Sequence, residues 1–344
     1  MTQAELAPKL KVPQGVLSRM EAGVSTVGEA LLPRFAEALD YPIAFFQQPE
    51  LPLGLGTEAY HQLYRKRKAL PAKALRRIEA QVNIVRMHTD QMLKAVELEH
   101  DRVVPKLSAE EYGSDVEQIA ATVRAAWLLP SGPVASVMTC LEDAGVVVVP
   151  FDFGTDQVDA TSLRAPNGPP LVIYNRNLLG DRLRFTLAHE LGHLVMHSLV
   201  PDPAMEEQAD RFASEFLMPA REISPSLNRL SIPRAAQLKQ FWKVSMASLI
   251  YRAGSLGKLT TNQAKYLWVQ MSAAGYRTRE PRELDVPIER PRIHRELLDS
   301  HLQGLGYTVA EFAQMLNSGL ADLQKFYHLG LPQVGALRMV SSTA

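Results

Sequence analysis

The stretch RFTLAHELGHLVMH, residues 184–197, places two histidines four residues apart, with a glutamate directly after the first. On a helix, residues i and i+4 lie one turn apart on the same face, so His189 and His193 can direct ring nitrogens at one point about 2 Å from each. Glu190 is rotated by about 100° from His189, and its carboxylate can instead reach a water molecule at that point. This is the H-E-x-x-H arrangement of zinc hydrolases, in which the glutamate is the general base.

A catalytic zinc ion takes a third protein ligand and keeps a fourth position open for water. The downstream segment PDPAMEEQADRFASEFLMP, residues 201–219, has prolines at both ends and predicts a helix between them. Glu206 and Asp210 are four residues apart on it, so one can bind the metal while the other accepts a hydrogen bond from a histidine ligand. We prefer Glu206 as the ligand over the competing Glu207, because Glu207 lies on a different helix face from Asp210.

These two segments resemble the ImmA/IrrE family of bacterial metallopeptidases, whose pattern is a histidine-glutamate helix followed by E-x-x-A-N/D-x-F-A and then L-M-P. Matched onto this sequence, the resemblance implies that His189, His193 and Glu206 bind Zn²⁺ and that Glu190 is the general base. Asp210 stands where the family often has asparagine. The resemblance extends from AGVVVVP to FLMP.

The activity that this resemblance implies is zinc-assisted hydrolysis of an amide bond, with Glu190 moving the proton and no nucleophilic side chain. In the family such enzymes act on transcriptional repressors, so the expected protein substrate is a repressor or a toxin-antitoxin partner. A degenerate peptidase whose zinc only braces the fold is the alternative. His197 and Tyr174 are near in sequence and could support an oxyanion, but we interpret His197 as a packed histidine.

The first 50 residues predict short helices separated by tight turns. TQAELAPKL offers Thr2 as a cap with Glu5 three residues later, and PQGVLSRMEAG begins with a proline and ends at Gly23. With the amphipathic VGEALLPRFAEALD and then PIAFF, these segments make a helix-turn-helix plausible.

This region resembles the repressor-type helix-turn-helix of bacterial and phage regulators (the XRE family), which is an all-α module. The resemblance implies that the second helix of the pair enters the major groove. It would face Gln14, Gly15 and Ser18 toward base edges and Arg19 toward bases or phosphate.

Two features separate this module from the usual pattern. The family's module normally opens with a helix before TQAELA, so we expect Leu6, Leu10 and Leu17 to lack part of their cover and translation to begin upstream of Met1. Residues 1–50 also carry four lysines and arginines against six acidic residues, whereas DNA-binding modules present a basic face. A helical interaction module that does not grip DNA is therefore the alternative.

A basic segment follows a linker rich in proline and glycine. Seven positive charges and no acid lie between His61 and Arg77, at the start of a predicted long helix with apolar residues at helical spacing. Those apolar positions are Leu75, Ile78, Val82, Val85, Leu93 and Val96. The charges form either a solvated face or a place that holds phosphates, so DNA is a possible partner.

The element that carries the histidines must be supported by a core. AGVVVVPFDF and PPLVIYNRN predict short strands, DATSLRAPNGPP between them a hairpin or loop, and Asp181 the cap of the histidine helix. The fold class expected is mainly α, with a small α+β zincin-like metallopeptidase core. The domains expected are the helix-turn-helix module at 1–48, the linker and basic helix at 49–105, the peptidase core at 106–222 and a helical region at 223–344.

Composition limits the class of protein. The chain has 344 residues, 46% of them hydrophobic and 22% charged, which is ordinary for a globular protein. We expect a cytoplasmic location and no membrane contact, because neither a signal peptide nor an apolar run of about 20 residues is present. The only cysteine, Cys140, excludes an intrachain disulfide and a multi-cysteine metal cluster, and its apolar setting favours a buried thiol.

The sequence therefore predicts a zinc-dependent regulatory endopeptidase with a DNA-binding type of module. The alternative is a DNA-binding repressor or antitoxin whose peptidase-like domain senses a ligand without cleaving protein.

Overall fold

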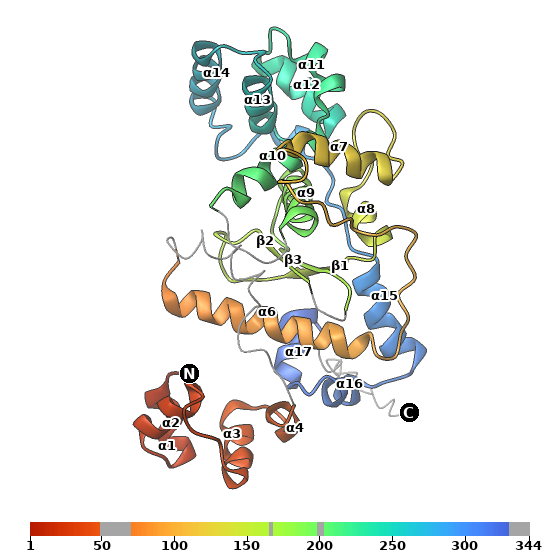
Figure 1. Ribbon diagram of the computed structural model, residues 1–344. Coiled ribbons are helices and arrows are strands. Elements are labelled where there is room, and N and C mark those ends of the chain that lie inside the picture. The colour runs from red at the N-terminus through yellow and green to blue at the C-terminus, as the bar shows by residue number, and fades with distance from the viewer. Residues whose placement is uncertain (49–69, 165–167, 198–202, 330–344) are drawn as a thin grey trace, which may run out of the picture. The chain divides into compact units, whose positions relative to one another are not determined.

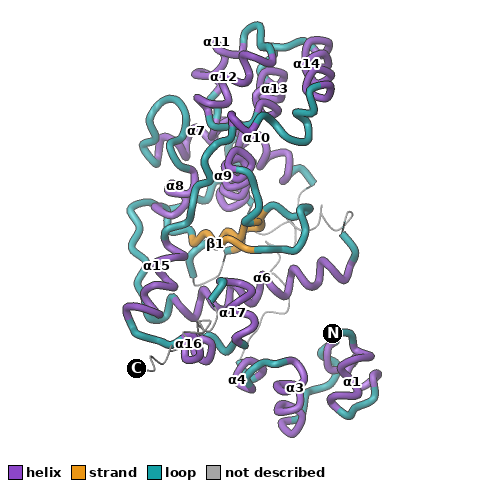
Figure 2. Tube along the Cα trace, turned by 180° about the vertical axis from the view of Figure 1, so that it is seen from behind, coloured by secondary structure: helices purple, strands orange, loops and turns teal. Residues whose placement is uncertain are grey.

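The computed structural model describes residues 1–48, 70–164, 168–197 and 203–329. The predicted fold class is confirmed: the chain is mainly helical with one small three-stranded sheet (Figures 1 and 2). It forms two compact units. The first combines Met1–Leu53, Met87–Val96 and Leu297–Ala344, and the second combines Gly54–Arg86 and Glu97–Glu296.

The sheet of the second unit consists of β1 (Val147–Phe151), β2 (Ala160–Leu163) and β3 (Leu171–Asn175), in the order β1-β3-β2. β1 runs parallel to β3, and β2 runs antiparallel to it. The two predicted strands are present as β1 and β3. The segment between them, predicted as a hairpin or loop, contributes β2 as a third strand, and all four of its residues are buried. Its Ala-Thr-Ser-Leu sequence has little of the β-branched and aromatic character that marks a strand.

Helices cover both faces of this sheet. α9 (Gly180–Met196) lies on one side, and the first part of α6 (Ala72–Met92) lies on the other (Figures 1 and 2). Arg77 of α6 donates a hydrogen bond to the carbonyl oxygen of Phe153, just after β1, at 3.2 Å. Because both faces are covered, β1 and β3 are buried along almost their whole length and read as continuous apolar runs.

α6 is the predicted long helix, with Leu75, Ile78, Val82 and Val85 buried. It ends at Met92, so the predicted continuation through Leu93 and Val96 is wrong. Apolar spacing alone does not mark a helix end, because a turn can continue the same pattern of burial.

The described residues of the second unit form further helices. They are α7 (Val116–Ala126), α8 (Val137–Asp143), α10 (Met205–Leu217), α11 (Ala220–Leu227), α12 (Ile232–Trp242), α13 (Met246–Ser255) and α14 (Thr261–Ala273), with a 3-10 turn at Arg282–Leu284 and the start of α15 (Ile293–Asp299). Of these helices, α8 and α10 pack on α9. One apolar core joins α7 to α14 with the sheet.

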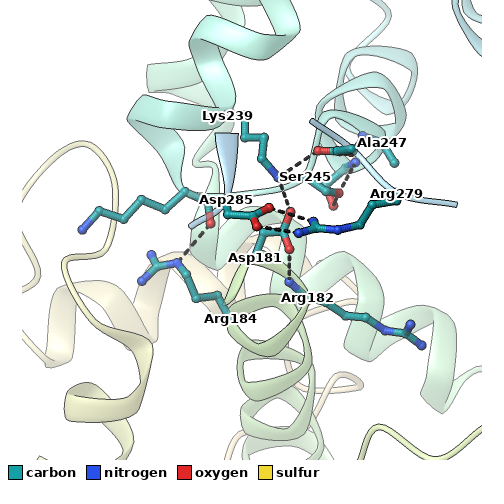
Figure 3. A network of polar contacts seen from close by, with 11 residues as sticks. Asp181, Arg182, Arg184, Lys239, Ser245, Ala247, Arg279 and Asp285 are labelled. Carbon is teal, nitrogen blue, oxygen red and sulfur yellow. Dashed lines mark hydrogen bonds and ion pairs between the residues drawn. The ribbon is translucent and has the colours of Figure 1, made fainter. Parts of the chain in front are cut away.

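Buried ion pairs anchor the beginning of α9 (Figure 3). Asp181 was predicted as the cap of this helix, and that prediction is wrong: the N-cap is Leu179, which has no capping side chain. Asp181 instead pairs with Lys239 of α12, and the same ammonium group lies 2.8 Å from Glu280. Arg184, one turn further along α9, is fully buried and donates to the carbonyl oxygen of Val134 at 2.6 Å. These contacts fix the helix that carries the histidines.

The segment after α14 crosses the start of α9 at a glycine. A Cβ atom on Gly180 would lie 2.1 Å from the carbonyl oxygen of Val286, a distance at which one of the two must move. The same segment pairs Glu289 with Arg184 of α9. Gly180 therefore permits the chain to close over the N-terminus of α9.

The first unit contains α1 (Gln3–Leu10), α2 (Gln14–Glu21), a 3-10 turn at Glu29–Leu31, α3 (Leu32–Leu39), α4 (Ile43–Phe46), the ends of α6 and α15, a π-helical turn at Ser300–Gly304, α16 (Val309–Met315) and α17 (Leu320–Tyr327). The predicted capping box is present, since Thr2 accepts from the Glu5 amide and the Glu5 carboxylate accepts from the Thr2 amide.

A small core stabilises α1 to α4. Leu6, Leu10 and Leu17 are buried against Phe35 of α3, and Phe46 packs against the same cluster. The expectation that these leucines lack cover is therefore wrong, because α3 and α4 supply it. Elsewhere in this unit, Tyr41 donates a hydrogen bond to Asp322 of α17.

Candidate metal centre

Close packing of α9 on α10 brings the predicted metal ligands together. A Cβ atom on Gly192 of α9 would lie 3.1–3.2 Å from the side chain of Phe212 on α10, so glycine allows the helices to approach. Phe212 is fully buried and stacks on Phe216 one turn later, with ring centroids 5.9 Å apart. α10 thereby presents its first turns to the histidines of α9.

The predicted ligands form one cluster. One ligand atom from each of His189, His193 and Glu206 lies within 4.8 Å of the other two. The Nε2 atoms of the two histidines are 3.0 Å apart, and a carboxylate oxygen of Glu206 is 3.4 Å from Nε2 of His193. Glu207, the alternative ligand, is exposed and is not part of this cluster.

Asp210 holds one of these histidines. Its carboxylate lies 2.8 Å from Nδ1 of His189. An ionised carboxylate only accepts hydrogen bonds, so Nδ1 carries the proton and the neutral ring presents the lone pair of Nε2 to the cluster. Burial alone would lower the pKa of His189, but the hydrogen bond to Asp210 and the charges of Glu190, Asp210 and Glu206 raise it above its ordinary value.

Glu190 is buried beside the cluster, with 4% of its surface exposed. Its Oε2 atom makes no hydrogen bond to the part of the chain that the structure describes. A buried carboxylate oxygen without a partner is costly, so this atom suits a bound water molecule or a ligand.

The residues present fit a zinc ion. Two imidazole nitrogens and one carboxylate are a ligand set that catalytic zinc uses, and two nitrogens on a tetrahedral zinc lie about 3.3 Å apart. The observed 3.0 Å between the Nε2 atoms is close to this value. Asp210 turns the lone pair of His189 toward His193, so this nitrogen is available to a cation between the two rings.

His197 follows α9 directly and also contacts the cluster. Its Nδ1 atom lies 2.8 Å from Nδ1 of His193, and its Nε2 atom lies 2.8 Å from the side-chain oxygen of Gln208 on α10. Burial and the neighbouring His193 lower the pKa of His197 to about 4. Tyr174, the other residue considered for the oxyanion, is buried in β3, where burial raises its pKa to about 12.

The predicted DNA-facing residues lie together on α2. Gln14, Gly15, Ser18 and Arg19 are all exposed, while Leu17 on the opposite side is buried in the small core. A Cβ atom on Gly15 would meet no atom within 4 Å. The face is therefore exposed with respect to the described residues of the first unit.

The turn between α1 and α2 recurs between α12 and α13. Lys11 and Lys243 both adopt a left-handed conformation with φ of 56°, and a valine and an N-cap residue follow each. The residues of α13 that match Gln14 and Ser18 are Met246 and Ile250, and both are buried. Of these two helix pairs, only the first has exposed residues at these positions that a partner could contact.

Comparison with known families gives two matches within the chain. Residues 141–253 match the model of the IrrE N-terminal-like domain of the M78 peptidase family, and residues 1–46 match the helix-turn-helix family. The chain carries an IrrE N-terminal-like domain. The matched range includes the sheet, α9, α10 and the helices through most of α13. No curated protein matches the chain.

The predicted cysteine and basic residues lie outside the two matched ranges. Cys140 is buried in α8, where burial raises the pKa of its thiol. Arg65, Lys66, Arg67 and Lys68 lie outside the described residues, whereas Lys73, Arg76 and Arg77 are exposed on α6. None of the helices that the structure describes is long and apolar enough to cross a membrane.

Two contacts beside the metal cluster, those of His197 and Gln208, were not predicted from the sequence. His197 was expected only to pack, and a lone glutamine such as Gln208 carries no signal of its own. The clue available was the spacing of four residues from His193 to His197.

Proposed function

We propose that this chain is a zinc-dependent regulatory endopeptidase whose helix-turn-helix module directs it to, or holds it near, a transcriptional regulator. The observation that carries the proposal is the Oε2 atom of buried Glu190, which has no hydrogen-bond partner among the described residues and belongs to the residue next to His189 of the metal cluster. A site that only braced the fold with a metal would have no use for such an oxygen.

In this proposal His189, His193 and Glu206 would hold the metal, and Asp210 would keep the ring of His189 in place. When bound, zinc supplies a Lewis acid that polarises a carbonyl group and makes water acidic near neutral pH. Glu190 accepts the proton of the attacking water at its Oε2 atom and passes it to the amine nitrogen that leaves. No side chain forms a covalent bond with the substrate.

The proposed substrate is a repressor, often of the helix-turn-helix type, or a toxin-antitoxin partner. The helix-turn-helix match and the open face of α2 also favour a second function, a DNA-binding repressor or antitoxin whose peptidase-like domain only senses a ligand. The two functions differ in whether they need Glu190.

Glu190→Gln separates these functions, because it spares the proposed ligands and removes the base. A host strain that lacks the gene would be complemented with the wild type or the variant, and new protein N-termini and transcript levels would be compared. The peptidase proposal expects termini that appear with the wild type alone, while zinc content is equal in both purified proteins. Equal transcript control by both forms, with no Glu190-dependent terminus, supports the sensor instead.

A further inference from the structure

A chain of three side chains leads from α10 to the metal cluster. The side-chain oxygen of Gln208 lies 2.8 Å from Nε2 of His197, and Nδ1 of His197 lies 2.8 Å from Nδ1 of His193. Beyond His193, its Nε2 atom faces Nε2 of His189 at 3.0 Å. His197 and His193 thus each make contacts with both ring nitrogens, one on the side of the cluster and one on the far side.

The direction of these hydrogen bonds follows from the chemistry of the first acceptor. An amide oxygen only accepts, so Nε2 of His197 carries the proton and Nδ1 of the neutral ring has the lone pair. That lone pair accepts a hydrogen bond from the protonated Nδ1 of His193, which leaves the lone pair of His193 on Nε2. With Gln208 oriented this way, the chain points a metal-binding nitrogen at the cluster.

If the hydrogen bonds from residue 208 to His193 ran in the opposite direction, His193 would present a proton to the cluster instead of a lone pair. A donor at position 208 would put the proton of His197 on Nδ1, and His193 would then accept there and carry its own proton on Nε2. That proton would point at Nε2 of His189 and close a hydrogen bond where a cation would otherwise bind. The residue at position 208 therefore selects between a metal-binding and a metal-rejecting arrangement.

We propose that Gln208 and His197 are positioning residues that fix the tautomer of His193 so that its Nε2 atom binds zinc. This inference rests on the metal site of the proposed function. The role parallels that of Asp210 for His189. Here two neutral side chains, Gln208 and His197, which we call the relay, take the place of a carboxylate. Both groups come from α10, so one helix supplies Glu206 and orients both histidines.

Zinc affinity, measured by competition with a chromogenic chelator at pH 8, tests the relay without any substrate. Gln208→Met keeps the length of the side chain and removes the acceptor, and His197→Phe keeps a ring and removes both nitrogens. Each is expected to lower the affinity about 10- to 100-fold. Gln208→Glu keeps an acceptor and should bind zinc within a few-fold of the wild type. Glu207→Gln, on the exposed neighbour, is the control for α10.

Nitrogen NMR of the zinc-loaded protein labelled at histidine gives a second readout, which a merely structural role would not move. The relay expects the proton of His193 on Nδ1 and that of His197 on Nε2. A proton on Nδ1 of His197, or unchanged zinc affinity in both His197→Phe and Gln208→Met, overturns it. If those variants bind zinc but His193→Ala does not, the metal site stands and only the relay fails. If the wild type binds no zinc, the proposed function fails as well.

Discussion

Asp210 of α10 accepts a hydrogen bond from Nδ1 of His189 on α9 at 2.8 Å, so the helix that supplies Glu206 also orients a histidine. Outer partners of this kind typically change metal affinity 10- to 100-fold. Asp210→Ala should weaken zinc binding by about that factor, whereas Asp210→Asn keeps an acceptor oxygen and should lose less. Equal affinity of Asp210→Ala and the wild type in chelator competition would contradict this role.

The purified protein should contain about one zinc ion per chain. His189→Ala, His193→Ala and Glu206→Ala should each lower zinc content, because each removes one of three proposed ligands. Elemental analysis after dialysis measures this. Glu207→Ala is the matched control on the same helix, and loss of zinc from it but not from Glu206→Ala would reverse the assignment.

Two glycines in helices should respond oppositely to alanine. Gly180→Ala forces a Cβ atom to within 2.1 Å of a backbone oxygen and should lower the free energy of unfolding by about 1–3 kcal/mol or more. A Cβ atom on Gly254 in α13 would meet no atom within 4 Å. Gly254→Ala should therefore raise the free energy of unfolding by about 0.5–1 kcal/mol. Urea unfolding of the two variants decides the point, and a stabilised Gly180→Ala would refute the close crossing.

Acid should destabilise the first unit through a buried histidine. His88 is 1% exposed and contacts the hydroxyl of Tyr327 at 2.9 Å, and burial lowers its pKa to about 3. The unfolded chain takes up a proton near pH 6.5 and the folded chain does not, so this contribution to stability is full above pH 6.5 and is lost as the pH falls toward 3.

The variant His88→Gln has no proton to take up at this position. Between pH 6 and 4, unfolding free energy of the wild type should therefore fall more steeply than that of the variant, by up to about 1.4 kcal/mol per pH unit. Urea titrations at several pH values give the two slopes. Parallel slopes would show that His88 titrates normally in the folded protein.

Binding to DNA should have a sequence-specific component from α2 and a sequence-independent component from the basic segment. Gln14→Ala or Ser18→Ala should weaken binding to the proper operator by ~1–3 kcal/mol per contact and leave random duplexes unaffected. Replacing Arg65, Lys66, Arg67 and Lys68 with alanine should weaken binding to every sequence and flatten its dependence on salt. Gel shifts over a salt series separate these effects. If neither duplex binds at low salt, the module is a protein-docking surface.

The sequence by itself determined features that depend on neighbours along the chain. The four-residue spacing of His189 and His193 places both rings on one face of any helix that contains them, and the pairing of Thr2 with Glu5 is a contact within one turn. The mainly helical fold followed from helical spacing of apolar residues, and the buried strands β1 and β3 followed from short β-branched and aromatic runs.

Tertiary structure decided what depends on contacts between distant segments. β2 has a weak sequence signal and exists because β3 supplies its hydrogen bonds. Asp181 is a partner of Lys239 rather than a helix cap because α12 folds back onto the start of α9. The contact between Gln208 and His197 likewise requires α10 to pack on α9, since residues on separate helices meet only where packing places them.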